Sequence, residues 1–253
     1  MITYLFMLTG CFGDDGYKEN GVYYDKYGFS NYAISIVSDY NADGTFIYAK
    51  DRIKGKTVTV IGVYPMIGKA WFGEYTGEKA VRIYFPWSIE ETFLWEWEST
   101  EEDVTEYVIT ASTKKLVSIT PLKNNKGGGK YVVSNYVFNE IEKGVFNRIH
   151  NVSNIEIENF IPANIVYFFN YEDEPNKGYF FIDIQEETGK LIKPPYDPQR
   201  KWYKFDGWYT EPECINKWDF DNDEVTISYD ESGNRIYEEI KLYAKWKRSL
   251  FGI

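Results

Sequence analysis

Short runs in which apolar and polar residues alternate dominate the chain, and this pattern predicts strands more than helices. The first clear run starts at Tyr32 and continues on both sides of "NADG", which predicts a hairpin with Asp43-Gly44 in its tight turn. A third strand is expected at 57–61. Residues 12–30 are rich in Gly, Asp, Asn and Tyr without clear periodicity, which is typical of a linker that leads into a first strand.

Two segments further along share one arrangement of large and small residues. One begins at Ile67 and the other at Ile141; in each, a small residue follows after three positions and a Phe after five. An alternating apolar pair comes later, Ile83 and Phe85 in the first segment and Ile155 and Ile157 in the second. Each unit is expected to be one turn anchored by Phe and one short strand, which hides its apolar row only when neighbouring units stack. Residues 93–135 between them match poorly and hold either one degenerate repeat or an insertion.

This repeat resembles the BspA-like leucine-rich repeat of bacterial surface proteins. The matching residues of the first copy are Ile67, Gly68, Ala70, Phe72, Ile83, Phe85, Pro86, Ser88 and Ile89, and those of the second are Ile141, Phe146, Val152, Ile155 and Ile157. The resemblance implies a short, irregular leucine-rich-repeat domain over residues 23–163. The glycine-rich "NNKGGGK" at 124–130 is expected to be a turn, because it lacks the Gly-Lys-Ser/Thr ending of a phosphate loop.

A different texture begins at Asn164. Two strands are expected on either side of "EDEPNKG", followed by a proline-rich crossing at 194–198 and a final strand, "EIKLYAKW". From Asn164 to Trp246 this block resembles the Listeria-Bacteroides repeat, also called the internalin B-repeat. The residues that carry the resemblance are Pro194 or Pro195, Pro198, Tyr203, Phe205, Gly207, Trp208, Tyr209, Trp218, Phe220, Leu242, Tyr243, Ala244 and Trp246.

The resemblance implies a second, small domain of β-grasp-like fold over residues 164–248, of a kind that occurs in extracellular proteins. The chain departs from the family pattern at three places. Trp202 stands where the family has Gly, "EDEPNKG" replaces a pair of glycines, and "SYDESGNRIYEE" lengthens the link to the last strand. The fold class expected for the whole chain is therefore mainly β.

The N-terminus carries a candidate membrane anchor. "MITYLFMLTGC" is an apolar run that ends in Leu-Thr-Gly-Cys and looks like a bacterial lipobox, so Cys11 would receive diacylglycerol and residues 1–22 would be signal and tether. No Lys or Arg precedes the run, and the alternative is an ordinary hydrophobic N-terminus. The other cysteine, Cys214, is expected to be a small buried residue and not a nucleophile.

Composition narrows the chemistry. The chain has 28 Lys plus Arg against 39 Asp plus Glu, a net charge of −11, which disfavours nucleic acid as a partner. One histidine, His150, and the lack of nucleophile or metal-ligand motifs favour a protein that is not an enzyme and has no cofactor or metal. The acidic run from Asp219 to Glu224 is either a charged loop or an incomplete calcium loop.

Tryptophans divide into two groups. Trp208, Trp218 and Trp246 belong to the family framework and are expected in the core. No packing pattern requires Trp87, Trp95 and Trp97, which form the candidate binding surface. The function expected is adhesion or recognition at the bacterial cell surface, with a protein or glycan of host or envelope as ligand. Alternatives are a structural spacer of the envelope and a carbohydrate-binding module.

Overall fold

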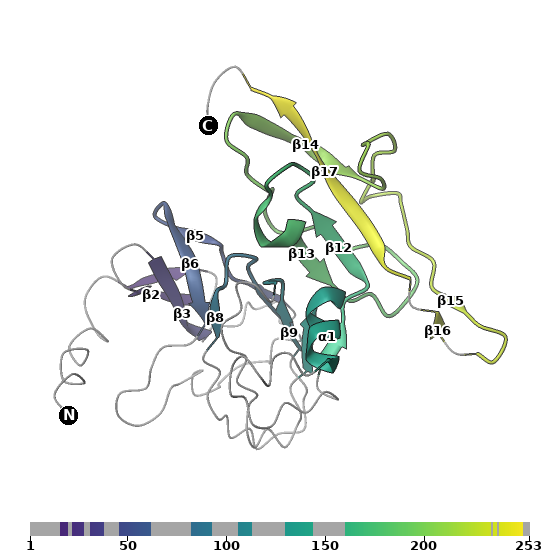
Figure 1. The fold of residues 1–253 in the computed structure, drawn as a ribbon, viewed down its shortest axis with the longest axis horizontal. Coiled ribbons are helices and arrows are strands. Elements are labelled where there is room, and N and C mark those ends of the chain that lie inside the picture. The colour runs from purple at the N-terminus through teal and green to yellow at the C-terminus, as the bar shows by residue number, and fades with distance from the viewer. Residues whose placement is uncertain are drawn as a thin grey trace.

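The computed structural model describes residues 16–19, 22–27, 31–37, 46–61, 82–92, 106–112, 130–143, 160–233, 235–236 and 238–249, which are the coloured parts of Figure 1. Within these ranges the chain is mainly β, as expected, with one α-helix. The strands form three main sheets and one small hairpin.

The middle sheet is parallel and its strands lie in the order of the chain. Each strand pairs in parallel with the one before it. The strands are β4 (Phe46–Tyr48), β7 (Arg82–Phe85), β9 (Glu106–Ile109), β10 (Lys130–Val133) and β11 (Phe160–Pro162). Both β9 and β10 fall within 93–135, so this segment adds two strands to the sheet and not one degenerate unit.

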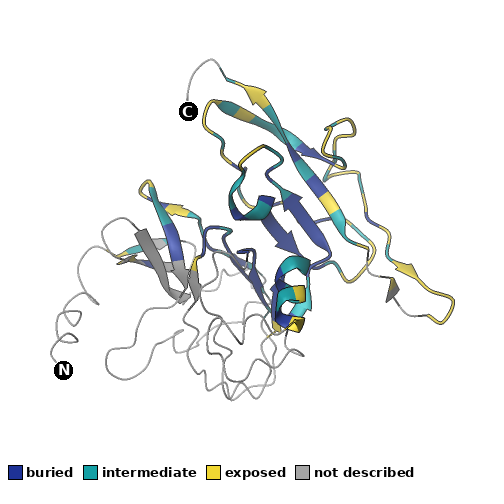
Figure 2. Ribbon diagram, in the orientation of Figure 1, coloured by how far each residue is buried: buried dark blue, intermediate teal, exposed yellow. Residues whose placement is uncertain are grey.

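Both faces of the parallel sheet are buried (Figure 2). On one face, one aromatic ring from each of four neighbouring strands stacks on the next, with centroids 6.4, 5.6 and 5.1 Å apart. These rings are Phe85, Tyr107, Tyr131 and Phe160. The opposite face, with Tyr84, Val108 and Val132, belongs to a second core that it shares with the C-terminal sheet. These strands are almost continuously apolar because a parallel sheet that is covered on both faces has no side exposed to solvent.

The N-terminal sheet differs from the prediction. β3 (Asn31–Val37) pairs with β2 (Val22–Tyr27) and with β6 (Lys56–Ile61), whereas β4 joins the parallel sheet. The predicted hairpin across "NADG" is therefore wrong, because its two strands enter different sheets; residues 38–45 lie outside the described residues.

Three further strands, β1, β5 and β8, complete this sheet. The third strand expected at 57–61 is confirmed as β6, which also pairs with β5 (Arg52–Ile53) and β8 (Glu91–Thr92). β1 (Tyr17–Glu19) and β2 occupy part of the segment expected as a linker, and β1 lies within the residues expected as tether.

The C-terminal sheet follows the expectation closely. The strands β12 (Ile165–Phe168) and β13 (Tyr179–Asp183) are antiparallel around the "EDEPNKG" turn. The final strand is β17 (Ile240–Arg248), which lies between β12 and β14 (Tyr203–Tyr209). No strand forms across Pro194, Pro195 and Pro198. The lengthened link forms a hairpin, β15 (Ser228–Tyr229) with β16 (Arg235–Ile236), which Figure 1 shows projecting from the sheet.

One helix, α1 (Asn135–Glu142), follows β10 and was not expected. Ser134 caps it, accepting a hydrogen bond from the Val137 backbone N–H at 3.3 Å, and Val137 and Ile141 are buried. The helix spans two turns, which is too short for its apolar spacing to stand out from that of a strand. Ile141, expected to open the second repeat, lies in its last turn, whereas Phe146, Ile155 and Ile157 lie outside the described residues. The part of the chain that the structure describes contains no helix with the length and apolar character of a membrane span.

Candidate functional site

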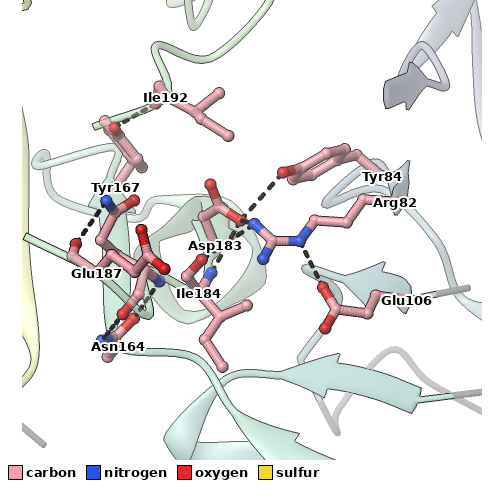
Figure 3. Close-up of polar contacts among 10 residues, drawn as sticks. Arg82, Tyr84, Glu106, Asn164, Tyr167, Asp183, Ile184, Glu187 and Ile192 are labelled. Atoms are coloured by element: carbon pink, nitrogen blue, oxygen red, sulfur yellow. Dashed lines mark hydrogen bonds and ion pairs between the residues drawn. The ribbon is translucent and has the colours of Figure 1, made fainter. Parts of the chain in front are cut away.

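A buried polar network joins the parallel sheet to the C-terminal sheet (Figure 3). Asp183, at the end of β13, points its Oδ1 atom at two side chains of β7: Arg82 Nη1 donates to it at 2.9 Å and the Tyr84 hydroxyl at 3.0 Å. The Ile184 backbone N–H donates to the same oxygen at 2.8 Å. Arg82 also donates to the Ile184 carbonyl at 3.0 Å and, through Nε, to Glu106 of β9. We call this set of Arg82, Tyr84, Glu106 and Asp183 the joint.

The charges of the joint are set by burial and by one another. The side chains of Arg82, Glu106 and Asp183 are 13, 12 and 3 % exposed. Burial raises the pKa of Asp183 to about 6, against the opposing effects of Arg82, the Ile184 N–H and Tyr84. Burial also works against the charge of Arg82, but Asp183, Tyr84 and Glu106 outweigh it and hold the pKa of the guanidinium above its usual value. Asp183 is therefore ionised and paired at neutral pH.

A second polar contact comes from the "EDEPNKG" turn. Asn176 has a positive φ of 53° and its side chain is buried against the end of β9. Its Nδ2 donates to the carbonyl oxygens of Thr110 and Tyr179, both at 2.9 Å, and its Oδ1 accepts from the Ser112 backbone N–H. One amide side chain thus hydrogen-bonds to backbone groups just after β9 and to the first residue of β13, and so links the two sheets. We call this contact the amide clip.

Aromatic rings fill the space around the joint. Phe181 of β13 stacks on Tyr84 of β7 with ring centroids 5.1 Å apart, and Tyr84 stacks in turn on Tyr48 of β4 at 4.7 Å. Trp87 meets the edge of Phe169 at 5.4 Å. Because these pairs join the two sheets in one apolar cluster, the sheets cannot separate without exposing it to water.

The contacts of the joint are internal to the protein and hold the two sheets together. An acid or base in catalysis must reach a substrate proton. In Asp183, the Oδ1 atom accepts hydrogen bonds from three donors of the protein, and the side chain is almost fully enclosed. In the described ranges, no group of three or more His, Cys, Asp or Glu side chains could hold a metal ion.

The structure places one of the sequence-predicted binding residues. Trp87 is half-buried between the sheets, where its ring packs on the C-terminal core, so much of it is used internally. Trp95, Trp97 and the predicted lipidation residue Cys11 lie outside the described residues, as does His150.

The acidic loop from Asp219 to Glu224 is arranged around its own backbone. Asp219 Oδ1 accepts from the Asp221 N–H at 2.9 Å, its Oδ2 accepts from the Asn222 side chain at 2.8 Å, and Asp223 accepts from the Asp219 N–H at 2.8 Å. The Asp219 and Asp223 carboxylates thus accept hydrogen bonds from donors within the loop itself.

Framework tryptophans lie in or against the core, as expected. Trp208 is 2 % exposed, while Trp218 and Trp246 are partly buried against the same cluster. Cys214 is also partly buried; burial raises the pKa of its thiol above the usual value, which agrees with an unreactive cysteine.

Sequence reasoning missed the joint and the amide clip. The signal for Arg82 and Asp183 was a charge at the end of an otherwise apolar strand in "RIYF" and "YFFID". A charge beside buried strands needs a partner, but the sequence does not show that two residues 101 positions apart will meet.

Comparisons with known proteins bear on the C-terminal sheet. Residues 169–245 match the profile of the Listeria-Bacteroides repeat domain, which confirms the resemblance for this part of the chain. Two proteins of Evansella cellulosilytica are similar over shorter stretches: a "Putative membrane protein", 28 % identical over 78 residues, and a "Putative Gly-rich membrane protein", 30 % identical over 80. Those stretches are 31 and 32 % of this chain, and the chain spans about a tenth of the length of each relative, 10 and 8 %. No solved structure matches the chain.

Proposed function

We propose that this protein is a non-enzymatic recognition protein of the bacterial cell envelope, in which a short leucine-rich-repeat array of the BspA-like kind supports one Listeria-Bacteroides repeat of β-grasp-like fold. The array interpretation is supported by the middle sheet, whose short strands stack in chain order with a continuous row of rings. The names of the Evansella relatives support a place in the envelope. Anchoring through lipid on Cys11 is part of the proposal.

The observation that carries this proposal is the way in which the two units share a core and close it with the joint. An ion pair and an amide clip between the sheets fix one orientation, because either contact is lost when the sheets rotate or slide. A rigid pair of units presents its outer surfaces without the ordering cost that a flexible pair would pay on binding. This favours recognition by a fixed surface.

The shared core also restricts where a ligand could bind. The described strands of the array are covered on both faces, one of them by the C-terminal sheet, so the strand faces are not open to a ligand. The partner, a protein or a glycan of the host or the envelope, would be recognised by the segment of the sequence that contains Trp95 and Trp97, or by the outer face of the C-terminal sheet.

The test is an array of glycans and matrix proteins probed with the full chain. Reproducible binding of a subset of ligands supports recognition, and loss of that binding in Trp95→Ala or Trp97→Ala assigns it to the segment that contains these two residues. If the protein binds none of the glycans and matrix proteins tested, the structural spacer is favoured. For the anchor, a fatty-acid analogue should label the wild-type protein in cells and fail to label Cys11→Ala; a wild type that takes up no label rules out the lipid.

A further inference from the structure

The turn from Arg200 to Tyr203 presents a tryptophan in a conformation that favours glycine. The Tyr203 N–H donates to the Arg200 carbonyl at 3.1 Å and closes the turn, and Trp202 occupies its third position with φ at +68°. The Trp202 carbonyl accepts from the Ser249 N–H at 2.9 Å, which pins the residue to the end of β17. Beneath the turn, the Arg200 guanidinium lies 3.8 Å from the Tyr203 ring centroid.

Trp202 nevertheless contributes little to the core. It is 52 % exposed, one of the largest apolar side chains that the described residues leave in water. A bulky residue in the left-handed region is uncommon, and strain of this kind is concentrated at functional positions. An exposed ring held in a strained turn that is pinned to Ser249, just after β17, indicates a contact residue.

Beside this turn, lysines gather on the outer face of the β14–β17 ladder. Lys204 and Lys247 are direct partners across the two strands, and Lys245 precedes Lys247 by two residues on β17 and lies on the same face. Lys217 reaches in over Gly207, where the missing side chain leaves room for it. We call Lys204, Lys217, Lys245 and Lys247 the basic stripe.

An aspartate, Asp206, lies among these lysines, and their positive charges lower the pKa of its carboxyl group. Asp206 forms an ion pair with Lys247 at 2.7 Å, and the hydrogen bond from Lys247, together with the charges of Lys217 and Lys245, holds the pKa of Asp206 below its usual value. Three lysines, Lys217, Lys245 and Lys247, act on this one carboxylate, and Lys204 pairs with Lys247 across the ladder, so positive charge is in excess here in a chain whose net charge is −11. The stripe is thus a local reversal of the protein's overall charge.

We propose that the basic stripe and Trp202 form a binding site for a linear polyanionic polysaccharide. Lys245 and Lys247 lie two residues apart on β17, a spacing of about 7 Å that is on the scale of the repeat along a sugar chain. Together with Lys204 across the ladder they would pair with its carboxylate, sulfate or phosphate groups. Trp202 lies at the end of the stripe, where its exposed ring stacks on a sugar face. A membrane surface fits less well, because the apolar residue lies at the edge of the cations and not within them.

This inference names a ligand class for the recognition function proposed above and rests on it. The test measures binding of the full chain to immobilised dextran sulfate, with uncharged dextran as the control polymer. We expect the wild type to bind dextran sulfate alone, with affinity that falls as salt is added. Lys204→Glu/Lys247→Glu should weaken binding by about tenfold or more, because two attractive contacts become repulsive.

Lys143→Glu/Lys193→Glu is the matched control variant. It changes the net charge by the same amount at two exposed lysines outside the stripe, and it should bind like the wild type. If the two double variants weaken binding equally, overall charge and not the stripe is responsible, and the proposal is wrong. Failure of the wild type to bind dextran sulfate while it binds vesicles of phosphatidylglycerol and phosphatidylcholine would overturn it in favour of a membrane surface.

The ring is tested separately. Trp202→Ala should weaken binding to dextran sulfate several-fold and leave binding to polyglutamate, which has carboxylates but no sugar rings, unchanged. An equal effect on both polymers, or on neither, contradicts sugar stacking. Loss of the stripe need not abolish binding of other ligands on the glycan and protein array, so this site can fail while the recognition function stands.

Discussion

Replacing Arg82 with methionine tests the joint most directly. The substitution keeps an unbranched apolar side chain in place of the aliphatic part of the arginine but removes the guanidinium that donates to Asp183 at 2.9 Å and to Glu106. Asp183 keeps the Tyr84 hydroxyl and the Ile184 N–H, neither of which carries charge. Breaking a buried ion pair at one partner costs about 3–5 kcal/mol, and the 3 % exposure of Asp183 places the joint in that class. A surface pair would cost under about 1 kcal/mol.

The double variant Arg82→Met/Asp183→Leu separates the cost of an unpaired buried charge from the net contribution of the ion pair to stability. With both charges gone, no unpaired carboxylate remains on β13, while Glu106 on β9, 12 % exposed, still lacks its donor, so we expect about half of the lost stability to return. Urea unfolding followed by tryptophan fluorescence at pH 7 gives the free energies of unfolding of the wild type, both single variants and the double variant. Additive effects of the two substitutions, or a cost below 1 kcal/mol for Arg82→Met, would refute a coupled buried pair.

The joint also predicts how stability depends on pH. The pKa of Asp183 is about 6 in the folded protein and near its ordinary value of 3.8 in the unfolded chain, so between these values the folded state binds the extra proton. The contribution of Asp183 to the free energy of unfolding is therefore fully present below about pH 4, falls as the pH rises to 6 and is flat above that. Its upper size is about 3 kcal/mol. Subtracting the pH profile of Asp183→Asn from that of the wild type should isolate this change, and parallel profiles would show that Asp183 titrates normally.

Three further substitutions address local geometry. Asn176→Ala should lower the free energy of unfolding by about 2–3 kcal/mol, since it leaves buried backbone groups of the amide clip unpaired, whereas Asn170→Ala in the same turn region provides a comparison at a partly exposed amide. Gly207→Ala should cost about 1–3 kcal/mol, because φ is +114° and a Cβ would meet the Lys217 Cε at 2.6 Å. Trp202→Gly should be more stable than Trp202→Ala by about 1 kcal/mol, the reverse of the usual order, because alanine keeps the left-handed strain. Thermal unfolding measures the stability of all these variants. If Trp202→Ala is more stable than Trp202→Gly, the turn relaxes and the strain argument is wrong.

The C-terminal sheet was predictable because its signals are local. A strand, a turn and a strand follow one another from Ile165 to Asp183, and the prolines exclude a central strand at 194–198. The framework rings recur in family order, so the core role of Trp208 could also be predicted. Each of these inferences needs only neighbouring residues or a known pattern.

The N-terminal half was harder because its pairing is not local. Nothing in "YAISIVSDYNADGTFIYAK" shows that its first strand joins one sheet and Phe46–Tyr48 another. Alternation predicts a strand but not its partner, and Asp43-Gly44 made a hairpin the simplest choice. β1 and β2 were missed for a different reason, since the Gly, Asp and Asn around them are typical of loops although Val22 and Tyr24 are buried.

The three departures from the Listeria-Bacteroides pattern indicate where this chain differs in what it does. "EDEPNKG" places Asn176 on the end of β9, so the lost glycines serve the attachment of the repeat to its neighbour. "SYDESGNRIYEE" forms the projecting β15–β16 hairpin, with Tyr229 62 % exposed. Trp202 keeps the glycine-like backbone and adds an exposed ring beside the basic stripe. The framework residues pack in or against the core of the C-terminal sheet, whereas these three departures lie outside that apolar cluster. Their side chains contact either the other unit or solvent, so the attachment and the binding properties particular to this protein should be sought there.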